Sequence, residues 1–208
     1  MTAWCAALFV VLGSGDLPTE MAYAEPPVGE REFEDGLFLR PYGGVWASRR
    51  FRFEATDTSG NTHLSASESL GSVGLDGGVR FAGHVVAFAT IEGDFRKDIR
   101  SELGGLSLGY RDSPGPDAPP GIPDEIMVYG GAIGGQFDVT TPGFGNFRDS
   151  VGGRLGLTLS WKVIHRVDVG ITAEWRYIHF AYEPAVTQGN TRIGDGTYWL
   201  GAKVEIRF

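Results

Sequence analysis

Residues 197–208 read TYWLGAKVEIRF, and this stretch decides the fold. Alternate positions carry apolar side chains, namely Tyr198, Leu200, Ala202, Val204, Ile206 and Phe208. The positions between them hold Thr197, Trp199, Gly201, Lys203, Glu205 and Arg207. Successive side chains of a β-strand point to opposite faces, so this period of two predicts a strand with one apolar face.

The same alternation recurs upstream from Leu37 onward. It is clearest in the segments 73–81, 85–95, 105–110, 127–138, 154–163 and 167–177. In the segment 127–138 we assign to the apolar face Met127, Tyr129, Gly131, Ile133, Gly135 and Phe137. After residue 30 no segment of helical period has a convincing length. The chain is therefore predicted to be all-β.

The connections between these segments differ in length. Residues 82–84 and 164–166 form very short turns, whereas 54–68, 140–149 and 183–191 are longer and polar. Short turns at one end and long loops at the other are typical of outer-membrane barrels. If both short turns lie at one end, an even number of strands separates them, which requires a strand at 105–110. Eight strands result, and residues 112–125, with five prolines and four acids, become a long turn at the short-turn end.

Composition indicates which face is outside. Glycine is abundant at 32 of 208 residues, against an average usage of ~7%. On the polar face we count Gly74, Gly78, Gly130, Gly134, Gly152, Gly156 and Gly170, which would make room inside a narrow barrel. Aromatic residues near strand ends indicate two membrane girdles: Phe81, Phe95, Tyr110, Tyr129, Phe137, Trp161, Trp175 and Tyr177. We therefore expect a closed antiparallel up-and-down transmembrane β-barrel; a soluble lipocalin-like ligand-binding barrel is the alternative.

The amino-terminal segment has the features of a secretory signal. An apolar run at 3–12 is too short to span a bilayer, and a small-x-small site follows at Ala22-Tyr23-Ala24. We predict a signal peptide at 1–24, a short periplasmic linker at 25–35 and the barrel at 36–208. A buried amino-terminal helix or strand is the alternative. Cys5, the single cysteine, falls inside the predicted signal, so the mature chain would carry no thiol.

These features together resemble a family, the small eight-stranded outer-membrane barrels of Gram-negative bacteria of the OmpA/OmpX/OmpW kind. The resemblance covers roughly residues 36–208 and rests on the signal, the alternating strands and the terminal strand. It implies an outer-membrane location and contact with outer-membrane lipid. It also implies that the barrel-insertion machinery reads a signal at Tyr198, Val204, Ile206 and Phe208.

The predicted inner face collects charges of both signs. They are Arg40, Asp76, Arg80, Glu92, Asp94, Asp138, Arg154, Lys162, Glu174, Arg176, Lys203, Glu205 and Arg207. The lumen of an eight-stranded barrel is just wide enough for side chains to fill it, and charges removed from water must be paired. We interpret the set as a salt-bridged plug; a narrow polar pore is the alternative.

The predicted function is a structural or surface-interaction role, with an unknown extracellular partner bound by the loops 54–68, 140–149 and 183–191. One alternative is a narrow channel or transporter for small or apolar solutes. A second is an outer-leaflet lipid-modifying enzyme using His63 or His179, with Glu183 or Ser65 as a partner. We expect no enzyme activity, and the net charge of −8 with no basic run argues against nucleic acid.

No cofactor or metal site is predicted. The glycine clusters at 130–135 and 152–156 lie in strand-like alternation, whereas a phosphate-binding loop must open a helix. The acids Asp112, Asp117, Asp124 and Glu125 lack the spacing of a calcium-binding EF-hand loop.

Overall fold

The computed structural model describes residues 35–47, 52–56, 62–65, 70–81, 83–96, 99–115, 119, 121–139, 146–182 and 196–208. Its strands are β1 (Gly36–Ala47), β2 (Arg52–Thr56), β3 (Thr62–Ser65), β4 (Leu70–Phe81), β5 (Val85–Arg96), β6 (Ile99–Asp112), β7 (Glu125–Val139), β8 (Asn146–Ile164), β9 (Val167–Tyr182) and β10 (Gly196–Arg207). The predicted signal peptide and all but the last residue of the predicted linker lie outside the described residues. In the described part of the chain, no helix is long and apolar enough to cross a membrane.

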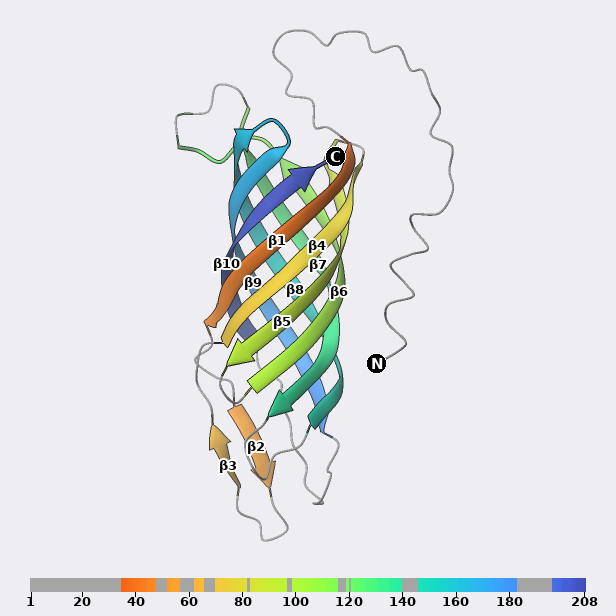
Figure 1. Ribbon diagram of the computed structural model, residues 1–208, viewed down its shortest axis with the longest axis vertical. Helices are drawn as coiled ribbons and strands as arrows, with labels where there is room; N and C mark the ends of the chain where they lie inside the picture. Colours follow the sequence, from red (N-terminus) through yellow and green to blue (C-terminus); the bar gives the residue numbers. More distant parts are fainter. Residues whose placement is uncertain are drawn as a thin grey trace, which may run out of the picture. The chain divides into compact units, whose positions relative to one another are not determined.

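Eight strands close into a barrel in the order β1-β10-β9-β8-β7-β6-β5-β4, and every neighbouring pair is antiparallel. The first strand, β1, pairs with the last, β10, so that Leu39 lies opposite Ile206 and no sheet edge remains open. Figure 1 shows the tilted strands of the barrel. The predicted all-β class and strand number are confirmed.

The long turn between β6 and β7 lies at the same end as the two short turns. The β4–β5, β6–β7 and β8–β9 connections all fall at this end, together with the start of β1 and the end of β10 (Figure 1). At the opposite end, β5 and β6 are joined through residues 97 and 98 alone, a short connection that the loop pattern did not predict.

Two predicted loops contain strand. The β2–β3 hairpin, a separate two-stranded sheet, occupies part of the region 54–68. Strand β8 already begins at Asn146, inside the predicted loop 140–149. Antiparallel strands joined by a few residues pair whenever their backbone groups can satisfy one another, and a polar sequence does not prevent this.

The two faces of the barrel separate apolar from charged side chains. Leu157, Ile171 and Val204 are 42%, 49% and 39% exposed on the outer surface, whereas Arg154 and Glu174 are 3% and 6% exposed. A soluble barrel places its apolar face inside, so this orientation excludes the lipocalin-like alternative. The outer surface matches the apolar band of a membrane barrel.

Strand β7 faces the opposite way from the prediction. Met127, Tyr129 and Ile133 point inward and are buried, while Val128 is 54% exposed on the outer face. The neighbouring strand explains this phase, because Tyr129 pairs with Gly156 of β8 and its ring takes the space that a Cβ at Gly156 would occupy. A correction to the glycine set follows from the same phase: Gly130 and Gly134 lie on the outer face.

An apolar layer therefore crosses the lumen. It consists of Phe38, Val86, Phe88, Met127 and Tyr129. The ring of Phe88 meets Phe38 and Tyr129 edge-on, with centroids 6.4 Å and 5.2 Å away. Edge-to-face aromatic pairs stabilise such packing beyond the area they bury. The lumen is thus not lined by charge alone.

Candidate functional site

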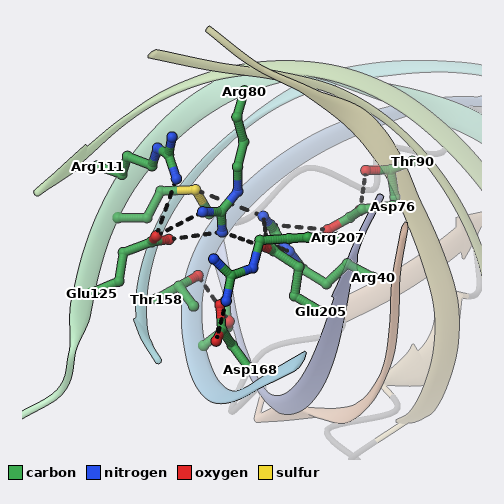
Figure 2. A network of polar contacts seen from close by, with 12 residues as sticks. Arg40, Asp76, Arg80, Thr90, Arg111, Glu125, Thr158, Asp168, Glu205 and Arg207 are labelled. Atoms are coloured by element: carbon green, nitrogen blue, oxygen red, sulfur yellow. Dashed lines mark hydrogen bonds and ion pairs between the residues drawn. The ribbon is translucent and has the colours of Figure 1, made fainter. Parts of the chain in front are cut away.

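The inward-facing charges form their first cluster near the end of the barrel where β1 begins, centred on Glu205 (Figure 2). Arg40 donates to Glu205 Oε2 from Nη2 at 2.6 Å and from Nε at 3.0 Å. Arg80 donates to the other carboxylate oxygen of Glu205 and, through Nη1, to Glu125 Oε2 at 3.0 Å. Glu205 therefore links the last strand, β10, to β1 and β4.

Further pairs extend this cluster around the barrel (Figure 2). Arg111 Nη1 lies 3.5 Å from Glu125 Oε2, and Arg207 Nη2 donates to Asp168 Oδ1 at 2.9 Å. Asp76 lies 3.6 Å from Arg40 Nη1 and accepts a hydrogen bond from the Thr90 hydroxyl at 2.6 Å. Opposite charges alternate in the cluster, which is what permits ionised groups to remain out of water.

Arg176 forms the second cluster and is completely buried. Its Nη1 and Nη2 donate to the two oxygens of Glu92 at 2.5 and 2.9 Å, and its Nε donates to Glu174 Oε2 at 2.6 Å. In the strand order, β9, which carries Arg176, and β5, which carries Glu92, lie four strands apart in either direction. This bidentate pair therefore bridges opposite walls of the lumen.

Phenol and hydroxyl groups complete the coordination of these charges. Tyr42 donates to Glu92 Oε2 at 2.6 Å, and Tyr129 donates to Glu174. Arg154 donates to the Ser107 hydroxyl at 2.9 Å and lies 5.3 Å from the centroid of the Phe88 ring. Buried polar networks stabilise a single arrangement when their members are satisfied, and these contacts supply the partners.

Two inward tryptophans lie toward the opposite end. The indole of Trp46 donates to Asp94 Oδ1 at 2.8 Å, and that of Trp199 donates to the Ser72 hydroxyl at 2.5 Å. Both rings lie near the Arg176 guanidinium, with centroids 4.7 and 5.1 Å from its Cζ. Trp199 lies on the polar face predicted for residues 197–208, whereas no prediction covered Trp46.

Most of the predicted lumen charges are buried. Those with buried side chains are Arg40, Asp76, Arg80, Glu92, Asp94, Arg154, Glu174, Arg176, Lys203 and Glu205. Arg207 is half-buried at the barrel end. Lys162 was wrongly assigned to the lumen, since its side chain is exposed where the pairing of β8 with β9 becomes irregular. The side chain of Asp138 lies outside the described residues.

Three charged members of the network were missed. Arg111 and Asp168 continue the inward alternation of β6 and β9, so the period-two pattern could have found them. Glu125 shares the phase of Met127 and Tyr129, and the wrong phase for β7 concealed it.

Only some of the predicted girdle aromatics lie on the outer face of the barrel. Phe81, Phe95, Tyr110, Trp175 and Tyr177 lie exposed on the outer face. Trp161 is half-buried and donates to the Gly121 carbonyl at 3.3 Å, whereas Tyr129 points into the lumen. The side chain of Phe137 is not described. The predicted insertion-signal residues Tyr198, Val204, Ile206 and Phe208 are exposed on the outer face, and their role as a signal stays a prediction.

The side chains of the four candidate enzyme residues lie outside the described part of the structure. These residues are His63, Ser65, His179 and Glu183. His84, by contrast, is at the short-turn end, with Nδ1 3.0 Å from the Arg111 carbonyl oxygen. Within the residues that the structure describes, no group of three His, Cys, Asp or Glu side chains could hold a metal ion.

A closed eight-stranded barrel with an apolar exterior and a charged, side-chain-filled interior is the architecture of small outer-membrane barrels. The protein has this architecture, and its outer face presents exposed apolar side chains. No protein-family model matches the sequence, and no curated protein matches it.

The chain aligns with several solved structures. Neisserial surface protein A aligns with a TM-score of 0.53 at 17% identity, over 83% of this chain and 99% of that chain. AlkL, solved by solid-state NMR in DMPC lipid bilayers, aligns with a TM-score of 0.47 at 12% identity, over 89% and 96%. OprG from Pseudomonas aeruginosa aligns with a TM-score of 0.45 at 14% identity, over 84% and 96%. The similarity to the Neisserial protein is one of fold.

Proposed function

We propose that the protein is a non-conducting outer-membrane barrel with a structural or surface-interaction role. The observation that carries this proposal is the bidentate pair between Arg176 and Glu92, which joins opposite walls of the lumen. The apolar layer around Phe88 also supports a lumen filled by side chains.

Opening such a lumen would require breaking buried ion pairs. Removing one partner of a buried pair costs about 3–5 kcal/mol, because the other charge is left without compensation. Arg176 holds two carboxylates at once, so its displacement would leave both Glu92 and Glu174 without their guanidinium. Because these ion pairs are costly to break, thermal motion of one side chain would not open a path for ions through the lumen.

The surface-interaction role would belong to the chain segments at the end opposite the short turns. The loops 54–68, 140–149 and 183–191 connect strands there and would meet an extracellular partner. The proposed location is the outer membrane of a Gram-negative bacterium, after export through the signal peptide at 1–24. Insertion would use the barrel-insertion machinery, with β10 as the recognised strand. The proposal includes no catalytic step.

Conductance measurements test the closed lumen. The full chain, refolded and inserted into planar lipid bilayers, is expected to show no step currents. The triple variant Glu92→Ala/Arg176→Ala/Phe88→Ala removes both charges of the bridging pair and the Phe88 ring of the apolar layer, and it is expected to conduct. The control Leu157→Ala/Ile171→Ala shortens two outward-facing side chains and should stay silent.

Step currents from the wild-type barrel would overturn the proposal in favour of a narrow channel. Heat-modifiable gel mobility establishes that each variant is folded before its currents are compared.

A further inference from the structure

A pocket of about 170 Å³ opens at the barrel end where β1 begins and β10 ends. Three arginines line it, Arg80, Arg166 and Arg207, together with Asp35, Leu37 and Phe208. One water molecule needs only ~10–15 Å³ of such volume, so the pocket has room for a larger polar group. The mechanism proposed for the lumen does not use it.

The turn between β8 and β9 holds Arg166 in an unusual backbone conformation. Its φ is +72°, in the left-handed region that residues other than glycine rarely occupy. Its carbonyl oxygen accepts the Arg207 backbone N–H at 2.9 Å, which ties the turn to β10. Among the residues that the structure describes, no carboxylate pairs with the Arg166 side chain. An exposed guanidinium is thus anchored at the rim by its backbone.

Arg80 forms the inner wall and is 3% exposed. Its two Nη groups donate to Glu125 and Glu205, but its buried Nε–H meets no hydrogen-bond acceptor in the described part of the chain. A buried donor left without an acceptor costs about 1–3 kcal/mol. An acceptor atom entering the pocket could offset that cost.

Three guanidinium groups line the pocket; Arg80 and Arg207 are paired with carboxylates, whereas no carboxylate partner is described for Arg166. The one carboxylate side chain in the lining, Asp35, already accepts the Gly83 backbone N–H at 3.1 Å. Arg207 donates to Asp168 Oδ1 through Nη2 at 2.9 Å. On the membrane side, Leu37 and Phe208 present exposed apolar surface. The pocket therefore joins a cationic wall to a lipid-facing edge.

We propose that this pocket binds a phosphate-type oxyanion. The planar fork of a guanidinium matches the oxygens of phosphate, and charge-assisted hydrogen bonds of this kind are among the strongest in proteins. The phosphate could belong to the headgroup of a phospholipid in the adjoining leaflet or to a soluble phosphate. The site does not depend on whether the lumen conducts.

Two binding measurements on the refolded full chain in a phosphate-free maltoside detergent separate these sources. Titration calorimetry with inorganic phosphate reports the soluble ligand, and native mass spectrometry with added phosphatidylglycerol reports the lipid. Saturable binding is expected in at least one measurement, and the one that shows it identifies the source. Absence of saturable binding in both would overturn the site.

Arg166→Gly is the informative variant, because glycine accepts the positive φ while the side chain that carries the guanidinium is removed. It should weaken binding about tenfold, the effect of losing one charge-assisted hydrogen bond. Lys162→Ala removes an exposed positive charge that does not line the pocket, and it should change binding less than about twofold. Equal binding by wild type and Arg166→Gly would overturn the proposal, with gel mobility verifying that each variant is folded.

Discussion

Individual charged residues in the lumen are stabilised by partners on strands that are distant in sequence. Arg176 illustrates this, since its two carboxylate partners lie on β5 and on its own strand β9. Tyr42 and Tyr129 each donate a further hydrogen bond to those carboxylates. The energy of each residue therefore depends on closure of the barrel as well as on its local sequence.

Removing the central guanidinium should be costly. Arg176→Leu leaves Glu92 and Glu174 buried without their cation and should destabilise the barrel by about 3–5 kcal/mol. Urea unfolding in lipid vesicles, followed by tryptophan fluorescence, measures this change. Lys162→Ala, an exposed position, should stay within about 0.5 kcal/mol of wild type. A loss below about 1 kcal/mol for Arg176→Leu would contradict the described network.

Two glycines of β8 test the packing around Tyr129. A Cβ at Gly156 would lie 2.6 Å from Tyr129 Cε1, so Gly156→Ala should cost about 1–3 kcal/mol in the same unfolding assay. Gly153 faces outward, and a Cβ there would meet only the Gly131 carbonyl at 3.7 Å. Gly153→Ala should therefore be neutral or slightly stabilising. Equal effects at the two sites would show that the ring does not lie over Gly156.

Within each strand, the alternation of apolar residues predicts the strand correctly, but it can fail to predict which face points into the lumen. The segments that became β4, β5, β6, β8, β9 and β10 each have a charged or hydroxyl-bearing face, and their predicted phase is correct. In β7 both candidate faces consist of apolar residues and glycine over 126–135. Hydropathy could not distinguish them, and the register with β6 and β8 decided which set entered the lumen.

Spin labelling checks the phase of β7. In a Cys5→Ser background, nitroxides at Val128→Cys and Ala132→Cys should be accessible to oxygen dissolved in lipid, because both positions face outward. A label at Ile133→Cys should be shielded within the barrel. Electron paramagnetic resonance accessibility measures the difference. The reverse pattern would restore the phase predicted from sequence.

The whole molecule is held by closure of β1 on β10 and by the cross-lumen pairs inside that closed sheet. Glu205 of β10 receives Arg40 of β1 and Arg80 of β4, so the same strand that completes the backbone ladder also completes the ionic cluster. Closure should therefore be cooperative, with the outer apolar surface requiring lipid or detergent around it.

Cell fractionation should find the protein in the membrane fraction. Its gel mobility should shift only after boiling in detergent, because a closed barrel without free edges resists unfolding. A double variant that places charge on the lipid face, Leu157→Lys/Ile171→Lys, should lower the amount of folded protein, at about 2–4 kcal/mol per lysine near the bilayer midplane. Recovery of the wild type in the soluble fraction without a mobility shift would contradict the membrane assignment.

The sequence by itself determined the class of fold, the number of strands and the orientation of most faces. Period-two alternation is a local property, and a strand such as 197–208 shows its two faces without reference to its neighbours. Parity of the short turns supplied the remaining strand, at 105–110.

Only the tertiary structure decided the phase of β7, the partners of each buried charge and the pocket around Arg166. These depend on register and on closure of the barrel, which bring Arg176 to Glu92 across 84 positions of sequence. No local pattern encodes such a pairing, because distance across a lumen is set by which strands lie opposite one another.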